Sequence, residues 1–200
     1  MRTALRALRA TLLLAAVTGI AYPLVMTGIG QVAFAHDADG SLVDVAGQPV
    51  GSALIGQRWT GPQWFYGRPS AVQNDAATSS GTNLGPRSQQ LADDIESRAT
   101  AILKLESPYT PGLTTADIPV DLLAASGSGL DPDISPAYAV LQVARVAKAR
   151  NLPADKVKGL VDVQTKRPAL GIFGEPRVNV LLLNLALDDI MKSHAPPRSG

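Results

Sequence analysis

The feature that most constrains this chain is an apolar stretch, residues 10–35, which holds no Asp, Glu, Lys, Arg or His. At a helical rise of about 1.5 Å per residue, it reaches roughly 39 Å, whereas the hydrocarbon core of a bilayer is about 30 Å thick. A helix satisfies its own backbone polar groups, so such a stretch can cross lipid. We therefore predict a single transmembrane helix over residues 11–34.

The charges before this stretch predict its orientation. Arg2, Arg6 and Arg9 stand directly before it, and basic residues next to a span tend to stay in the cytoplasm. We therefore expect a single-pass protein of the cell (inner) membrane, with residues 1–10 cytoplasmic. Residues 36–192 would form an extracytoplasmic domain, followed by a flexible tail over residues 193–200.

A secretory signal peptide is the competing interpretation of the same stretch. Ala33-Phe34-Ala35 has the A-x-A pattern of a cleavage site, and the start of the chain is basic. Against cleavage, the apolar run exceeds the usual length of about 7–15 residues in a signal peptide. A cleaved, secreted binding domain therefore stays open as the alternative. In either case the rest of the chain is exported.

Small residues inside the stretch suggest where another helix could pack. Pro23 lacks an N–H and crowds position 19, but Gly19 relieves that crowding, so we expect a kinked, continuous helix. Gly19, Pro23 and Gly28 are candidate partner-facing positions, because small residues let helices approach closely. Glycine is also simply common in membrane helices. The stretch holds no ionisable residue, so we do not expect it to carry ions.

The remainder of the chain predicts one mixed α/β (α+β) domain. Hydrophobic residues make up 46% of the sequence, enough for a core, and the absence of cysteine excludes disulfides. Without its three N-terminal arginines the chain has a net charge near −2, which argues against a nucleic-acid partner. Expected elements are a hairpin (41–55), a strand (120–125) and helices over residues 88–105, 135–150, after 153 and 179–191.

Two clusters could contact a partner. Trp59, Trp64, Phe65 and Tyr66 fall within eight positions and would form either a small core under a loop or an interface anchor. Eight basic residues against three acidic ones lie between residues 145 and 177. They could meet anionic lipid, an acidic partner or a phosphate, although solvated helix faces look similar. The candidate interface residues of the exported part are Trp64, Phe65, Arg68 and Arg145.

Catalytic chemistry has few candidate residues. The two histidines, His36 and His194, lie outside the folded middle, so a Ser-His-acid triad is not expected. Without cysteine or paired histidine there is no zinc site, and no Walker A sequence is present. We predict no catalytic residue, no metal site and no cofactor bound by the chain alone.

Seven stretches together resemble a known family. They occur in the family's order and cover the chain from the apolar stretch to the last predicted helix: residues 22–31, 51–57, 65–71, 80–86, 125–136, 142–150 and 174–180. On these residues the sequence resembles the C subunits of Kdp-type potassium-transporting ATPases. The resemblance implies a retained anchor rather than a cleaved one.

The resemblance also implies a function and partners. It implies a non-catalytic accessory subunit that stabilises assembly and raises the ATP affinity of the hydrolysing subunit, as a catalytic chaperone. The partners would be a channel-like potassium-binding subunit, an ATP-hydrolysing P-type subunit, a small extra subunit in some cases, and membrane lipid. The complex, rather than this chain alone, would handle ATP and potassium.

One residue carries the family's proposed nucleotide contact. Gln142 matches that position, but the expected topology places it outside, whereas ATP is in the cytoplasm. A charged nucleotide does not cross the bilayer to reach it. We therefore expect any effect on ATP affinity to be long-range coupling through the membrane helices, which must be reciprocal.

Overall fold

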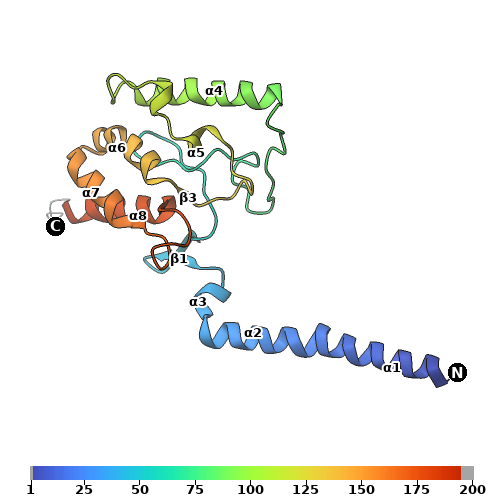
Figure 1. Cartoon of the computed structure of the whole chain (residues 1–200). Coiled ribbons are helices and arrows are strands. Elements are labelled where there is room, and N and C mark those ends of the chain that lie inside the picture. The colour runs from blue at the N-terminus through green and yellow to red at the C-terminus, as the bar shows by residue number, and fades with distance from the viewer. Residues whose placement is uncertain (1, 195–200) are drawn as a thin grey trace. The chain divides into compact units, whose positions relative to one another are not determined.

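The chain divides into two compact units, Met1–Ser52 and Ala53–Gly200 (Figure 1). The computed structural model describes residues 2–194, with side chains up to residue 190. The predicted hairpin groups with the first unit, so the division between the two units falls after residue 52. The expected extracytoplasmic domain over residues 36–192 stays a prediction.

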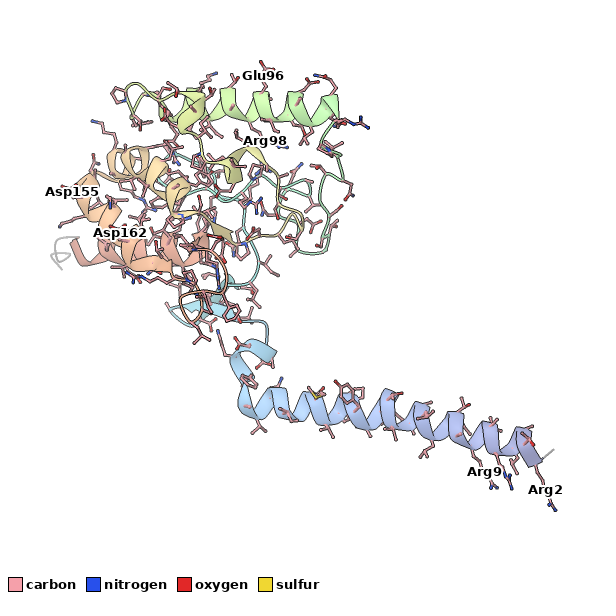
Figure 2. All side chains as sticks on the ribbon, in the orientation of Figure 1. Arg2, Arg9, Glu96, Arg98, Asp155 and Asp162 are labelled. Atoms are coloured by element: carbon pink, nitrogen blue, oxygen red, sulfur yellow. The ribbon has the colours of Figure 1, made fainter. Side chains whose placement is uncertain are left out.

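The first unit begins with one continuous helical run, Arg2–Ala33, which is long and apolar enough to cross a membrane by length and composition. It consists of α1 (Arg2–Ala16), the π-helical turn η1 (Val17–Ala21) and α2 (Tyr22–Ala33). The helix includes most of the predicted cytoplasmic segment, and the side chains of Arg2 and Arg9 extend from its N-terminal end (Figure 2). The prediction of one N-terminal membrane-length helix is confirmed.

The π-helical turn lies directly before Pro23. The N–H of Tyr22 donates to the carbonyl of Val17, five residues earlier. Pro23 brings no N–H to the ladder, and a widened turn makes room for its ring. The helix thus stays continuous through this position, with a π turn as the local irregularity.

A short helix and a hairpin complete the first unit. The helix is α3 (Ala35–Ala38), and the antiparallel strands are β1 (Leu42–Val45) and β2 (Gln48–Ser52). Ala46 and Gly47 both have positive φ, 53° and 77°, which is the requirement of a type I′ turn and matches the twist of the strands. The predicted hairpin is confirmed.

The second unit is a mixture of helices and a small sheet. Its helices are α4 (Gln89–Glu106), α5 (Val120–Leu123), α6 (Pro136–Arg150), α7 (Ala154–Gln164) and α8 (Val180–His194), with a 3₁₀ turn η2 (Thr115–Asp117). The strands β3 (Asp133–Ile134), β4 (Thr165–Lys166) and β5 (Arg177–Asn179) form an antiparallel sheet in the order β3-β5-β4. The α+β prediction is confirmed.

Local capping chemistry sets the start of two helices. The Ser88 hydroxyl accepts from the Leu91 N–H at 3.4 Å, and the Ser135 hydroxyl accepts from the Tyr138 N–H at 3.0 Å. Ser135 is followed by Pro136, whose fixed φ suits the first helical turn. Asn151, with φ 53°, ends α6 in the left-handed conformation. Both predicted helix starts are confirmed.

The predicted strand over residues 120–125 is wrong, because α5 occupies this stretch. Pro119 turns the chain into a helical turn, in which the N–H of Leu122 donates to the carbonyl of Pro119 at 3.0 Å. Leu122 points into the core, whereas Val120 is exposed. A short apolar run does not distinguish a strand from a buried helical turn.

The last helix begins one residue later than expected and continues beyond its predicted end at residue 191. It therefore contains residues 193 and 194 of the predicted tail. The rest of that tail, residues 195–200, lies outside the described residues.

The core of the second unit lies where α6, α7, α8 and the sheet meet (Figure 1). Its fully buried members come from each of these elements and from the segment before α4: Phe65, Ile134, Ala139, Val146, Val157, Val161, Val178, Leu183 and Leu187. Helix α4 packs on α5 and α6. On α4, Glu96 points away from the rest of this unit, whereas Arg98 points toward it (Figure 2) and donates to the Leu123 carbonyl at 2.8 Å.

Candidate functional site

The aromatic segment, residues 59–66, runs across the core of the second unit without regular secondary structure. Phe65 is fully buried within the core, and the Trp59 and Trp64 ring centroids lie 4.9 Å apart. A segment without helix or strand must satisfy its backbone polar groups in another way when it is buried. Side chains of two helices, α6 and α8, do this.

Arg145, on α6, makes two of these contacts and is 0% exposed. Its Nη1 donates to the carbonyls of Pro62 and Trp64 at 2.7 and 2.9 Å. Its Nε donates to Glu106 Oε1 at 2.7 Å, and its Nη2 donates to Gln142 Oε1 at 2.7 Å. The fixed fork of a guanidinium allows one side chain to serve four acceptors.

Two amide side chains hold the next residues of the segment in matching fashion. Gln142 Oε1 accepts from the Tyr66 N–H at 2.7 Å, and its Nε2 donates to the Tyr66 carbonyl at 3.2 Å. Asn184, on α8, accepts from the Phe65 N–H at 2.9 Å and donates to the Phe65 carbonyl at 3.0 Å. Both amide side chains are 0% exposed. We call Glu106, Gln142, Arg145 and Asn184 the polar clamp.

Aromatic rings and a second arginine surround the polar clamp. The Arg145 guanidinium lies 4.4 Å from the centre of the Tyr66 ring, within the range of a cation–π contact. The Arg150 guanidinium lies 4.3 Å from the Trp64 ring. Arg150 also donates to the Gln63 carbonyl and, at 2.6 Å, to Asp188. The backbone from residue 62 to residue 66 is thus bonded to side chains of α6 and α8.

The electrostatics of the polar clamp are those of a buried ion pair. Glu106 is the carboxylate partner of Arg145, and its Oε2 is buried without a hydrogen-bond partner. Burial raises the pKa of Glu106 above its ordinary value of 4.5, and the charge of Arg145 opposes this shift only in part. Removing one partner of such a pair leaves the other charge buried and unpaired.

A second polar feature is a cavity of about 410 Å³ beside β3 and β5. Arg68 donates to Asp131 at 2.9 Å, and Arg177 pairs with Asp133 at 3.0 Å. Burial raises the pKa of Asp133, against the charge of Arg177. The cavity is lined by Arg68, Asp121, Asp131, Asp133, Ile134, Ser135, Glu175, Pro176 and Arg177.

Close backbone approaches explain why several glycine-containing stretches meet near this cavity. The Gly56 N–H donates to the Leu130 carbonyl at 2.8 Å, and a Cβ on Gly56 would collide with the carbonyl of Asp131. A Cβ on Gly129, whose φ is +70°, would lie 2.7 Å from the Ser80 carbonyl. Residues 51–57, 80–86 and 125–136 therefore pack backbone against backbone, and only glycine fits these two positions.

The structure brings together four of the predicted site residues: Trp64, Phe65, Gln142 and Arg145. Arg68 lies apart from them, in the wall of the cavity. The remaining candidates, Gly19, Pro23 and Gly28, are exposed on the helix of the first unit. Phe65 and Arg145 are 0% exposed, so any effect of these two residues on a partner would be indirect. Their assignment to an interface stays a prediction.

Sequence reasoning missed Glu106, Asn184 and Asp188, and it noted Arg150 only as a member of the basic cluster between residues 145 and 177. Asn184 had a detectable signal, because it interrupts an otherwise apolar run, residues 180–187. Such a lone amide within a core helix needs hydrogen-bond partners. Glu106 gave no comparable signal, since it ends an ordinary amphipathic helix.

The hydrogen bonds of the polar clamp immobilise the aromatic segment. Each guanidinium nitrogen of Arg145 and both amide atoms of Gln142 bond to groups of the same unit. Within residues 2–190, His, Cys, Asp and Glu side chains form no group of three or more that could hold a metal ion. The arrangement fixes an aromatic segment to α6 and α8.

Comparison with known proteins gives the family. The chain matches, over residues 4–189, the family described as KdpC: K+-transporting ATPase, c chain. Three relatives share the name potassium-transporting ATPase KdpC subunit. The protein of Caldanaerobacter subterraneus is 48% identical (94% of this chain, 96% of the relative), that of Ralstonia nicotianae 54% (88% and 86%), and that of Gemmatimonas aurantiaca 51% (96% and 96%). The resemblance seen in the sequence is therefore confirmed, and the chain belongs to the KdpC family.

Proposed function

We propose that this chain is a non-catalytic accessory subunit of a potassium-transporting ATPase. It stabilises the assembled complex and raises the ATP affinity of the hydrolysing subunit by long-range coupling, as a catalytic chaperone without direct nucleotide contact. The names of the relatives support the assignment to a potassium-transporting ATPase. Potassium and ATP would be bound by the partners, a channel-like subunit and a P-type ATPase subunit.

The burial of Gln142 carries the coupling part of the proposal. Its side chain is 0% exposed, and both amide atoms hold the backbone of Tyr66. A nucleotide could reach this amide only after the aromatic segment had left the polar clamp. We therefore assign Gln142 a structural role, and its effect on ATP affinity would follow from the shape of the domain that docks on the partners.

The N-terminal helix supports the second part of the proposal, attachment to the complex. It is long enough to span a bilayer and has arginines at its start. We propose that it is retained, with the N-terminus in the cytoplasm and the second unit outside. Gly19, Pro23 and Gly28 are the positions where a partner helix could approach closely. By linkage, if docking of this chain tightens ATP binding, ATP tightens the docking by the same factor.

The test compares two matched substitutions, Gln142→Ala and Asn184→Ala. Each removes a buried amide that holds the N–H and the carbonyl of one residue of the aromatic segment. ATP affinity is measured on the assembled complex, and unfolding is measured on each variant. We expect ATP affinity to fall in both variants in proportion to their loss of stability. A loss of ATP affinity confined to Gln142→Ala, at equal loss of stability, would instead support direct nucleotide contact.

A secreted, cleaved binding domain is the alternative, and the helix ends close to the A-x-A pattern, at Ala33. N-terminal sequencing of the protein from membranes separates the two, because cleavage would produce a chain that starts at His36. A variant that lacks residues 1–34 but is still exported should fail to assemble. Normal potassium uptake with that variant would refute the proposed anchor.

A further inference from the structure

The connection between β4 and β5 carries an exposed apolar turn. Ala169 and Phe173 pair across it, each N–H donating to the other's carbonyl at 2.9 Å. Three large apolar side chains extend into solvent around this turn: Leu170 is 88% exposed, Ile172 76% and Phe173 61%. We call residues 168–174 the apolar finger. Contiguous exposed apolar groups of this kind mark interaction sites.

The backbone of the apolar finger holds one of these side chains in an unfavourable conformation. Leu170 has φ 53° and is followed by Gly171 with φ 79°. A bulky residue with positive φ is uncommon, and such strain persists where the surrounding structure imposes it, often at functional sites. Ala169 and Phe173, which are hydrogen-bonded to each other, impose this strain, because their pairing forces a tight turn that contains Leu170.

Basic residues stand at the base of the apolar finger. Lys166 and Arg167 are exposed directly before it, and Glu175 follows it, whereas Arg177 is already paired with Asp133 at 3.0 Å. An apolar tip with Lys and Arg at its base matches the boundary of an anionic bilayer, where apolar groups enter the acyl region and cations meet the headgroups. This charge pattern favours lipid over an apolar protein groove.

Within the second unit, the strand that follows the apolar finger is bonded to the residue at which the chain enters this unit. Asn179, at the end of β5, donates to the carbonyl of Ala53 at 2.8 Å, and Ala53 is the first residue of the second unit. Phe173 and Asn179 are six positions apart in the sequence, a reach of at most about 20 Å.

We propose that the apolar finger inserts Leu170, Ile172 and Phe173 into the interfacial layer of the membrane that the N-terminal helix crosses, with Lys166 and Arg167 on anionic headgroups. The inference rests on the retained anchor of the proposed function and adds a second membrane contact. A domain held at two points would keep a fixed orientation toward its partners, which a single flexible tether would not provide.

The test uses the full chain, which contains no cysteine, reconstituted in vesicles. A single cysteine at Ile172→Cys carries an environment-sensitive fluorophore. Val120→Cys is the matched control, because Val120 is an equally exposed apolar residue, at 76%, on α5 of the same unit. The vesicles contain phosphatidylcholine with or without phosphatidylglycerol, and a quencher is attached to the lipid near the headgroup.

We expect blue-shifted emission and lipid quenching at position 172 but not at position 120. The quenching at 172 should increase several-fold with phosphatidylglycerol, and Lys166→Gln with Arg167→Gln should abolish that increase. Emission at 172 equal to that of the control would overturn the proposal. So would a finger that, in the assembled complex, crosslinks to a partner subunit without lipid quenching. The helix keeps every variant on the vesicle, so failure of the finger is distinguishable from failure of the anchor.

Discussion

Replacing Arg145 with alanine should destabilise the second unit more than any change to a surface ion pair. Arg145→Ala leaves Glu106, which is buried, without the guanidinium that donates to its Oε1 at 2.7 Å. Breaking a buried ion pair by removing one partner costs about 3–5 kcal/mol. It also removes the donors to the carbonyls of Pro62 and Trp64. Because a domain has only about 5–15 kcal/mol of stability, the loss is a large share of the total.

Two comparisons isolate the cause of that loss. Arg98→Ala removes a partly exposed i,i+4 pair with Asp94 and the hydrogen bond to the Leu123 carbonyl, and should cost roughly 1–2 kcal/mol. The double variant Arg145→Met with Glu106→Met replaces both charges with apolar groups. It should recover much of the loss, since an apolar pair is often as stable as a buried ion pair.

The assay is urea unfolding of the full chain in lipid nanodiscs, followed by tryptophan fluorescence. The only two tryptophans of the sequence, Trp59 and Trp64, both lie in the aromatic segment that the polar clamp holds. The signal therefore reports directly on the release of this segment. An Arg145→Ala midpoint no lower than that of Arg98→Ala would refute the reasoning.

Three further predictions concern single groups. Burial raises the pKa of Glu106 above 4.5, so the folded protein retains a proton that the unfolded chain releases, and this stabilising contribution is lost as the pH rises through the raised pKa. Between pH 4.5 and the raised pKa, the free energy of unfolding of the unsubstituted chain should therefore fall relative to that of Glu106→Gln, measured in urea melts at a series of pH values. Gly129→Ala, with φ +70° and a Cβ in contact with backbone, should lose roughly 2–4 kcal/mol in urea melts, whereas Gly67→Ala, with open space around it, should stay within about 1 kcal/mol. Ser135→Ala should lose about 1–2 kcal/mol in the same assay, because the hydroxyl caps α6 and also donates to Asp121.

Local chemistry allowed part of the fold to be predicted from the sequence. Ser88 and Ser135 were identified as helix caps from their own type and their neighbours, and the hairpin was identified from its turn residues. The sheet was missed, because β3 and β4 have two residues each, too few to show an alternating pattern. The strand expected over residues 120–125 was wrong because this apolar run is also too short to show a period. Pro119 starts a helical turn there instead.

The polar clamp was harder to predict than the fold. Trp64, Phe65, Gln142 and Arg145 were each singled out, but as separate candidates for contact with partners. A polar residue on a helix is ordinarily solvated, and nothing local indicates that Arg145 meets a carboxylate 39 positions earlier. The burial of these residues follows from the path of the aromatic segment, which is a property of tertiary structure.

The most direct test of the account asks on which side of the membrane the second unit lies. Lys148, exposed on α6 with Gln142 on the same helix, is replaced by the only cysteine of the full chain. The variant is produced together with the partner subunits in cells that depend on potassium uptake. A maleimide that does not cross membranes should label this cysteine in intact cells. Labelling only after the membrane is opened would place Gln142 on the same side as ATP and contradict coupling at a distance.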